Sequence, residues 1–458
     1  MGHEFYGLPN LPFDSGPPPR QDRGMSKEIY KPKAVSGFPE WLPGWRRLEQ
    51  KWLDHIRAVF ESYGYTNIET PAVEEAGVLQ AKGEITKEIY GLHRMAADSG
   101  DKDDARLALH FDLTVPMARY VAQHFNELEF PFKRYAMQKV WRGERPQKGR
   151  MREFYQCDID VISPDNLPLH FDAEMPAVMY EVFQGLGIGR TQVRISNRKI
   201  LTGLFQGAGL EDPLAAIQIV DKLEKIGGEK VTAELAALGV SADVAKQVLE
   251  VTAHVFTTSG ELKAIQPLND TMREGLEELG FILDTLSHLP QGAVVADLSI
   301  ARGLDYYTGT VYETRLLDVP EFTGSVCSGG RYDDLAGRFI NKHLPGVGIS
   351  IGLSRLFEVL MQAGKIEALS PSPTHVLVLL PSEERRAQAV STAAQLRARG
   401  MNVEVYHAPQ NPKKQFAYAE KKQIPFVWVT PFEDGQGHEV KNMATREQVA
   451  ADPQSWKA

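Results

Sequence analysis

The segment FKRYAMQKVWRGERPQKGRMREFYQCDIDVI, residues 132–162, decides which fold we expect for this chain. Two extended stretches flank the loop 145–150, and this pattern predicts a hairpin with a long basic tip. Side chains of the second stretch alternate between two faces of the strand. One face is apolar and suits a core, whereas the other carries Phe154, Gln156, Asp158 and Asp160. Burying such polar groups without partners is costly, so this face is either solvated or part of a binding site.

The tip of the hairpin is strongly basic. Six cations lie between residues 139 and 152, against the single acid Glu144: Lys139, Arg142, Arg145, Lys148, Arg150 and Arg152. Arginine presents a planar fork that suits phosphate oxygens. A charged run that is merely solvated usually mixes both signs more evenly, so the hairpin predicts a site for a polyanion. An RNA-binding scaffold that uses only this hairpin is an alternative, but it leaves the polar strand face unexplained.

A second stretch, ARGLDYYTGTVYE at residues 301–313, places an arginine, an aspartate and two tyrosines beside glycines. Its end reads as a strand, and polar groups on a mostly buried element need partners. A substrate that carries charge and ring nitrogens would supply them. An internal salt bridge beside two core tyrosines is the other interpretation of this stretch taken alone.

The bulk composition is that of a globular protein with two or three domains. The chain has 458 residues, of which 43% are hydrophobic and 24% charged, and its net charge of −9 argues mildly against a general nucleic-acid binder. No apolar run approaches the roughly 18–20 residues of a membrane span, and we find no secretory signal. Two cysteines, Cys157 and Cys327, cannot build a disulfide framework, so we expect a cytoplasmic location.

Motifs that would define other chemistries are absent from the sequence. It contains no GxxxxGK[ST] loop, no GxSxG elbow, and no HExxH or other metal-ligand spacing. We therefore assign no metal-ligating residue. Glycine-rich stretches at 185–189 and 346–348 do not complete a dinucleotide-binding motif, and we interpret both as turns.

The pattern of elements divides the chain into four parts. Residues 1–37, rich in Pro, Gly and charge, predict a flexible arm. Residues 38–198 and 291–370 form a core, into which the mostly helical stretch 199–290 is inserted. Strands and helices alternate in residues 374–458, which predicts a small α/β domain.

Taken together, these stretches resemble the class II aminoacyl-tRNA synthetases, and within them the histidyl-tRNA synthetase family, from about Phe38 to the C-terminus. The amphipathic helix 45–63 is similar to motif 1, the dimer element, while 132–162 and 346–357 are similar to motifs 2 and 3. The runs 302–307 and 329–333 are similar to signatures of the histidyl members. The resemblance implies an α+β fold, with an antiparallel-sheet catalytic core, a helical insertion and a C-terminal α/β anticodon-binding domain.

The resemblance also implies histidine–tRNA ligase activity in a homodimer. L-histidine would be activated with ATP to histidyl-adenylate and then transferred to the 3′ end of tRNA(His), with Mg²⁺ bridging the phosphates. Arg142 would hold the α-phosphate, Arg355 the γ-phosphate, and Arg302 would stabilise charge at the reacting phosphorus.

The same resemblance assigns the substrate contacts. The histidine site would comprise Asp112, Thr114, Gln156, Asp160, Arg302, Tyr306 and Tyr307. Within it, Asp112, Thr114 and Gln156 would surround the ammonium group. Asp160 and Tyr307 would bind the two imidazole nitrogens, because a ligand without them would leave buried polar groups unpaired. Gln147 and Arg152 would approach the acceptor end of the tRNA.

Two rival interpretations compete with this one. A non-catalytic, synthetase-like regulatory subunit of histidine biosynthesis predicts decayed ATP parts and no anticodon domain, yet all three arginines and the C-terminal domain are present. A synthetase for another amino acid would need different pocket residues. A threonyl enzyme requires Cys and His zinc ligands, and a prolyl or glycyl pocket has no use for Asp160 and Tyr307.

Overall fold

The computed structural model describes residues 30–80, 88–93, 106–147, 149–301, 307–431, 433 and 435–457. The chain divides into two compact units, Met1–Val35 and Ser36–Ala458, and the second contains every feature discussed below. It opens with the amphipathic helix α1 (Pro43–Ser62), which agrees with the apolar spacing of the sequence. Pro43 suits the first helical turn because its missing N–H would have no partner there.

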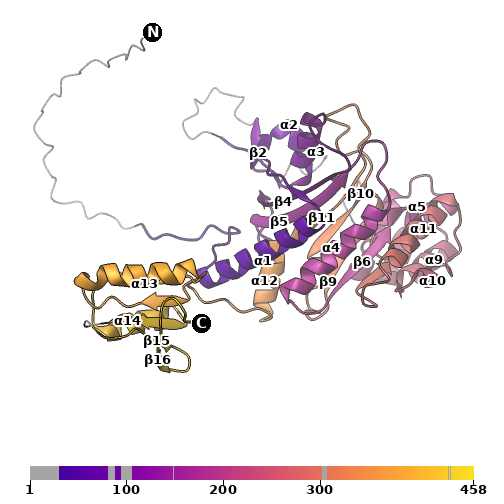
Figure 1. The fold of residues 1–458 in the computed structure, drawn as a ribbon. Helices are drawn as coiled ribbons and strands as arrows, with labels where there is room; N and C mark the ends of the chain where they lie inside the picture. The colour runs from indigo at the N-terminus through magenta and orange to yellow at the C-terminus, as the bar shows by residue number, and fades with distance from the viewer. Residues whose placement is uncertain are drawn as a thin grey trace, which may run out of the picture. The chain divides into compact units, whose positions relative to one another are not determined.

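A nine-stranded sheet forms the centre of the second unit (Figure 1). Neighbouring strands run antiparallel except in the pairs β1–β4 and β6–β8. In spatial order the strands are β1 (Thr66–Asn67), β4 (Phe132–Trp141), β5 (Glu153–Ile162), β11 (Gly346–Gly352), β10 (Cys327–Tyr332), β9 (Tyr307–Leu316), β6 (Thr191–Asn197), β8 (Val294–Asp297) and β7 (Val255–Phe256). The α+β fold expected from the resemblance is confirmed.

The hairpin expected in residues 132–162 is formed by β4 and β5, which pair from Phe132 with Ile162 to Trp141 with Glu153. The apolar face of β5 joins the main core, whose other side consists of the helices α1, α4 (His170–Leu186) and α12 (Leu353–Gln362). Figure 1 shows these three helices against one face of the sheet. The polar face of β5 therefore points to the opposite side. It is not solvated, because Gln156, Asp158 and Asp160 are all buried.

Residues 346–348 belong to strand β11 and not to a turn, so our interpretation of that glycine stretch was wrong. Alternate positions explain the error. Val347, Ile349 and Ile351 point into the core, while Gly346, Gly348, Ser350 and Gly352 occupy the other face. The Tyr332 and Asp160 side chains of the neighbouring strands fill the space above Gly346 and Gly348. The stretch 185–189 does form a turn, since α4 ends at Leu186 and Gly187 and Gly189 have positive φ.

The helices between β6 and β8 form the segment expected to be an insertion. They are α5 (Arg198–Gly207), α6 (Leu214–Val220), α7 (Leu223–Ile226), α8 (Gly228–Ala237), α9 (Ala242–Thr252), α10 (Ser259–Leu262) and α11 (Asp270–Thr285). Asn197, Ser241 and Asn269 cap α5, α9 and α11 by accepting a backbone N–H. Buried side chains of these helices belong to the same apolar cluster as the main sheet.

A smaller group of elements flanks the edge of the main sheet near β4. It comprises β2 (Val73–Glu75), α2 (Ala76–Leu79), β3 (Leu107–Leu109) and α3 (Thr114–Gln123), and β2 pairs with β3 in a separate two-stranded sheet. The turn between β3 and α3 contains Asp112, which the fold thereby brings to the start of a helix.

The C-terminal segment has a core of its own and a five-stranded sheet. Its elements, yellow in Figure 1, are β12 (Val376–Val378), the 3₁₀ turn η3 (Glu383–Arg385), α13 (Arg386–Ala398), β13 (Val403–Val405), α14 (Pro412–Lys421), β14 (Phe426–Val429), β15 (Glu439–Asn442) and β16 (Gln448–Ala450). The parallel strands β13, β12 and β14 match the alternating pattern of the sequence. The antiparallel strands β15 and β16 were not anticipated.

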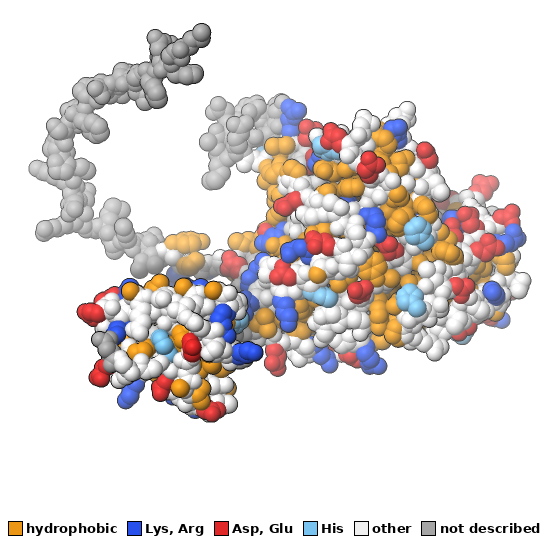
Figure 2. All heavy atoms as spheres, in the orientation of Figure 1, with side chains coloured by type: hydrophobic (Ala, Val, Ile, Leu, Met, Phe, Trp, Pro, Cys, Tyr) orange, Lys and Arg blue, Asp and Glu red, His pale blue; other side chains and the backbone are white. Residues whose placement is uncertain are grey.

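The surface shows no segregation of charge on the face drawn in Figure 2, where acidic and basic side chains are interspersed with apolar ones. Within the described residues, no helix has both the length and the apolar character needed to cross a bilayer. Cys157 and Cys327 are buried free thiols, and burial raises the pKa of both well above the ordinary value.

Candidate active site

A cavity of about 450 Å³ opens on the polar side of the main sheet. Strands β5, β10 and β11 contribute to its lining, together with the β4–β5 loop and the start of β9. Six of the residues that the sequence suggested line it: Asp112, Thr114, Arg142, Gln156, Tyr307 and Arg355. These residues are far apart in the chain, so the fold brings them to one place.

Glycines make room for the two groups expected to bind an imidazole ring. A Cβ atom at Gly348 would lie 2.1 Å from Asp160 Oδ1, and one at Gly330 would lie 2.8 Å from the Tyr307 ring. Gly348 and Gly330 are direct partners on β11 and β10. Because neighbouring strands are about 4.8 Å apart, the Asp160 carboxylate and the Tyr307 ring lie close together above the sheet.

The Asp160 carboxylate is held by two neighbours. Oδ2 forms a salt bridge with Arg134 on β4, and Oδ1 accepts a hydrogen bond of 3.0 Å from the Tyr332 hydroxyl. Arg134 is fully buried, and its Nε and Nη1 have no hydrogen-bond partner among the described residues. Asp160 is buried and is not among the residues that line the cavity. Since each carboxylate oxygen can accept more than one hydrogen bond, Asp160 retains the capacity to accept a ring N–H.

Acceptors suited to an ammonium group line the cavity. The Gln156 side chain donates from Nε2 to Ser350 Oγ at 2.7 Å, and among the described residues its buried Oε1 has no partner. Asp112 is 5% exposed, and its carboxylate accepts the Val115 backbone N–H at 3.1 Å, at the start of α3. Thr114 is the first residue of that helix. This group of oxygens can surround a small cation.

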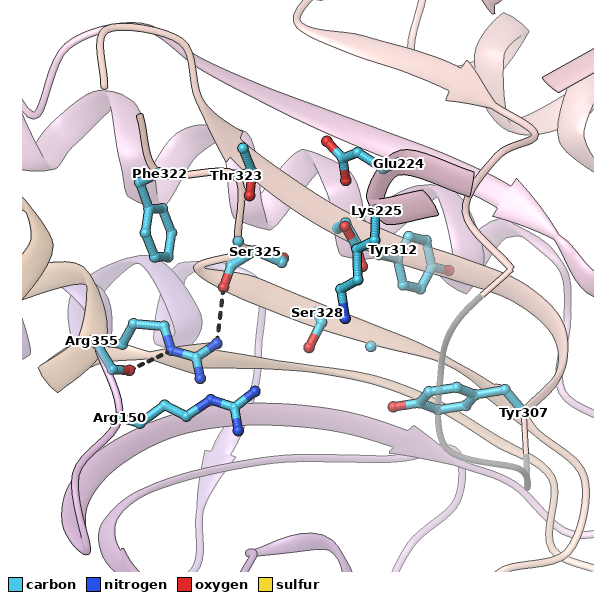
Figure 3. A pocket seen from close by; sticks show the side chains of 14 residues that line it. Arg150, Glu224, Lys225, Tyr307, Tyr312, Phe322, Thr323, Ser325, Ser328 and Arg355 are labelled. Atoms are coloured by element: carbon cyan, nitrogen blue, oxygen red, sulfur yellow. Dashed lines mark hydrogen bonds between the residues drawn. The ribbon is translucent and has the colours of Figure 1, made fainter. Parts of the chain in front are cut away.

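Arginine side chains concentrate positive charge at another part of the cavity. Arg142 lies over the Phe154 ring, 5.2 Å from its centroid, and donates to the Phe111 carbonyl at 3.1 Å. Arg355 donates to the carbonyls of Gly149 at 2.8 Å and Ser325 at 3.4 Å (Figure 3). Burial lowers the pKa of Arg355, and the charges of Arg150 and Arg142 lower it further. Arginine nevertheless stays protonated in proteins, so this cluster is suited to a polyanion such as a triphosphate.

A second hollow of about 550 Å³ adjoins the first and shares several lining residues with it. Figure 3 shows Arg150 and Arg355 together at one end and Tyr307 at the other, with Glu224 and Lys225 of α7 across from them. Phe322, on the connection between β9 and β10, also lines this hollow. The two hollows together offer space for more than one substrate.

Two other predicted residues, Gln147 and Arg152, are described but are not among the residues that line the cavity. Arg152 Nε donates to the Glu144 carbonyl at 3.2 Å, and its backbone N–H donates to the Gly37 carbonyl. Gln147 forms a backbone bridge with Arg150 across the tip of the hairpin. Arg302 and Tyr306 lie outside the described residues, so their expected roles stay predictions.

Sequence reasoning missed four residues that shape this site: Arg134, Arg150, Tyr332 and Ser350. Arg150 was noted only as one charge of the basic loop. Ser350 could have been found, because it is the one polar residue on the glycine face of β11. Tyr332 lies in the run 329–333 that the resemblance had singled out. Its hydrogen bond to Asp160, like the ion pair of Arg134, depends on the pairing of distant strands, which no local pattern reveals.

An antiparallel sheet with a basic hairpin, paired arginines and ammonium acceptors on one face defines a class II aminoacyl-tRNA synthetase. The family model described as histidyl-tRNA synthetase matches residues 37–356, and the anticodon binding domain model matches residues 375–455. The chain belongs to the histidyl-tRNA synthetase family.

Curated relatives and solved structures agree with this assignment. The histidine–tRNA ligase of Thermobifida fusca is 57% identical over 94% of this chain and 100% of its own length. That of Micrococcus luteus is 45% identical over 92% of this chain and 95% of its own. The crystal structure of histidyl-tRNA synthetase from Nostoc sp. PCC 7120 has a TM-score of 0.84 at 40% identity, covering 92% of this chain and 97% of that one.

A more distant structure bears on the regulatory alternative. The ATP phosphoribosyltransferase regulatory subunit/histidyl-tRNA synthetase from Bacillus halodurans C has a TM-score of 0.67 at 23% identity, covering 82% of this chain and 93% of that one. At 23% identity this likeness shows the fold alone. The full-length similarity to histidine–tRNA ligases therefore supports the catalytic interpretation over the regulatory one.

Proposed function

We propose that this chain is a histidine–tRNA ligase. It activates L-histidine with ATP to histidyl-adenylate and pyrophosphate, and it then transfers histidine to the 3′ end of tRNA(His) with release of AMP. The observation that carries this conclusion is the lining of one cavity by Asp112, Gln156 and Tyr307 together with Arg142 and Arg355.

In the activation step the histidine carboxylate attacks the α-phosphorus of ATP. Asp112 and Gln156 would accept hydrogen bonds from the ammonium group, while Asp160 and Tyr307 would bind the ring. Both contacts hold the carboxylate in place, and positioning supplies much of the rate enhancement in such a reaction. The Gly348–Gly330 arrangement supports the ring contact, because it brings Asp160 and Tyr307 together above the sheet.

Charge on the triphosphate would be balanced mainly by arginine. Arg142 would bind the α-phosphate and Arg355 the γ-phosphate, and Arg302 would add a cation where negative charge grows in the transition state. The fixed hydrogen bonds of Arg142 and Arg355 support these roles, because guanidinium groups held in advance need no reorganisation during the reaction.

Mg²⁺ would neutralise part of the charge on the phosphates of ATP. This ion usually keeps several waters and takes only one or two protein carboxylates in addition to phosphate oxygens. Glu88 and Glu144 line the cavity and fit that requirement. The protein would thus contribute few of the metal ligands.

In the transfer step the terminal ribose hydroxyl of tRNA attacks the histidyl carbonyl and AMP leaves. Gln147 and Arg152 on the hairpin would approach the acceptor end, residues 199–290 would form an insertion domain against the acceptor stem, and residues 374–458 would read the anticodon. A homodimer and a cytoplasmic location complete the proposal. The homodimer follows from the family resemblance, and the cytoplasmic location from the small number of cysteines.

The test is aminoacylation of total tRNA with radiolabelled histidine. The purified chain should charge one tRNA species, in a reaction that requires ATP and Mg²⁺. Absence of charging, combined with stimulation of ATP phosphoribosyltransferase, would favour the regulatory alternative.

A further inference from the structure

The polar face of β5 contains one buried acid to which the proposed reaction assigns no role. Asp158 is 2% exposed and lies between Gln156 and Asp160 on the same face of the strand. It does not line the cavity, and among the described residues its Oδ1 has no hydrogen-bond partner. A buried carboxylate in such a place calls for an explanation.

Ser350 connects Asp158 to the cavity. The two residues are direct partners across β5 and β11 and lie on the same face of the sheet, so the Ser350 hydroxyl stands beside the Asp158 carboxylate and lowers its pKa. Ser350 Oγ also accepts the Gln156 Nε2–H at 2.7 Å. A continuous chain of side chains therefore leads from Asp158 through Ser350 to Gln156, which lines the cavity.

The direction of the hydrogen bonds in this chain follows from the chemistry of its members. An ionised carboxylate only accepts, and a serine hydroxyl has a single hydrogen to donate. When Asp158 takes that hydrogen, Ser350 Oγ can only accept from Gln156. The side-chain amide must then turn its NH₂ group to Ser350, and its Oε1 is left facing away from the serine. This is the observed orientation, in which Oε1 is buried without a partner among the described residues.

We propose that Asp158 is a positioning residue, which acts through the Ser350 hydroxyl to hold Gln156 with its amide oxygen toward the ammonium group of the amino acid substrate. The inference rests on the proposed function, since it assigns histidine to this cavity. It explains why the amide oxygen of Gln156, and not its NH₂ group, would face the substrate. With the amide reversed, an NH₂ group would face the ammonium ion.

A purely structural role would be served better by a neutral residue. Burial raises the pKa of Asp158 to about 7, and Arg134 and the hydrogen bond from Ser350 oppose that rise only in part. The ionised form of Asp158 is thus unfavourable at this buried position. A bound ammonium group nearby would favour the ionised form, which is the form that directs Ser350.

The main test is Ser350→Ala, assayed by histidine-dependent ATP–pyrophosphate exchange in the full-length protein. Loss of a hydrogen bond to a charged substrate group should raise the KM for histidine about 10-fold, while the KM for ATP stays within about 2-fold. Ser354→Ala is the matched control. Ser354 Oγ accepts the Tyr155 backbone N–H at 2.9 Å, so this variant removes a bond to the same strand without touching Gln156. Its KM for histidine should stay within about 2-fold of wild type.

A substrate analogue separates positioning from general loosening of the pocket. Imidazolepropionate is histidine without the amino group, and its dissociation constant, measured by calorimetry, should be the same for wild type and Ser350→Ala. Weaker binding of this analogue by the variant would overturn the proposal, because the damage would then extend beyond the ammonium contact.

The Gln156→Leu background provides a second test. Ser350→Ala and Asp158→Asn should have no further effect on the KM for histidine once Gln156 is gone, because both act through its amide. If Ser350→Ala or Asp158→Asn raised the KM for histidine in the Gln156→Leu background as much as it does in wild type, the inference would be contradicted. If the wild-type protein shows no histidine-dependent exchange at all, the proposed function fails. If wild type exchanges normally and Ser350→Ala keeps its histidine KM, only the positioning role fails.

Discussion

Asp160→Asn perturbs a buried ion pair and the proposed ring contact together. The side chains of Arg134 and Asp160 are 0% and 5% exposed, so neither charge is compensated by water. Removing one partner of a buried pair typically costs about 3–5 kcal/mol, because the other charge is left unpaired. Two further nitrogens of Arg134 already lack partners among the described residues, so we expect the upper part of that range.

Removing both charges separates the two effects. Replacing a buried pair by neutral groups is often close to neutral in stability, so Arg134→Met should restore most of the stability lost in Asp160→Asn. The contact with the imidazole ring would still be missing in the double variant. Its KM for histidine should therefore stay raised at least about 10-fold, with a much smaller change for ATP.

Two measurements are needed for this cycle. Hydrogen exchange of the β4 and β5 amides in denaturant reports the free energy of opening of this core, which is separate from the C-terminal core. Pyrophosphate exchange reports the KM values. If Asp160→Asn costs no stability, the ion pair is not formed. If the double variant recovers its affinity for histidine, or if both substrates are weakened equally, Asp160 does not bind the ring.

Four further predictions follow from the same structure. Arg355→Ala should slow histidine-dependent exchange about 100-fold and raise the KM for ATP, since a preorganised cation is lost, and unchanged ATP dependence would contradict its role. Arg302→Ala should abolish adenylate formation in a folded protein, and exchange near the wild-type rate would refute that. Deletion of residues 374–458, which have their own core, should spare exchange and impair charging, so unaltered charging kinetics would count against an anticodon role. Asp158, whose pKa is raised to about 7, binds its proton more tightly in the folded state, so its contribution to stability falls as pH rises from about 4 through 7. Asp158→Asn should consequently increase the free energy of unfolding by roughly 2–3 kcal/mol more at pH 8 than at pH 5. Equal increases at both pH values would show that the pKa of Asp158 is not raised.

Local patterns in the sequence are sufficient to predict much of the catalytic sheet. The alternation in residues 153–162 predicts that Gln156 and Asp160 share one face of a strand, and strand pairing confirms that shared face. Helix α1 follows from apolar spacing in the same way. Both predictions depend on the spacing of apolar residues over a few positions, which can be read directly from the sequence.

Features that depend on long-range pairing were not predictable. Gly348 reads as a turn residue, yet it lies in strand β11. A glycine is needed there because a Cβ atom would collide with the Asp160 side chain of the neighbouring strand. Arg134 reads as a surface cation, and only its register opposite Asp160 reveals a buried salt bridge. The antiparallel strand β15 carries short, polar sequence without alternation, so its position beside β14 depends on tertiary packing.

The claim on which all else depends is that one cavity selects histidine and activates it with ATP. Pyrophosphate exchange measured with each of the twenty amino acids in turn tests it most directly. We predict that L-histidine alone supports ATP-dependent exchange, and that Arg142→Ala abolishes the signal. Exchange driven by another amino acid, or none with histidine, would contradict the account.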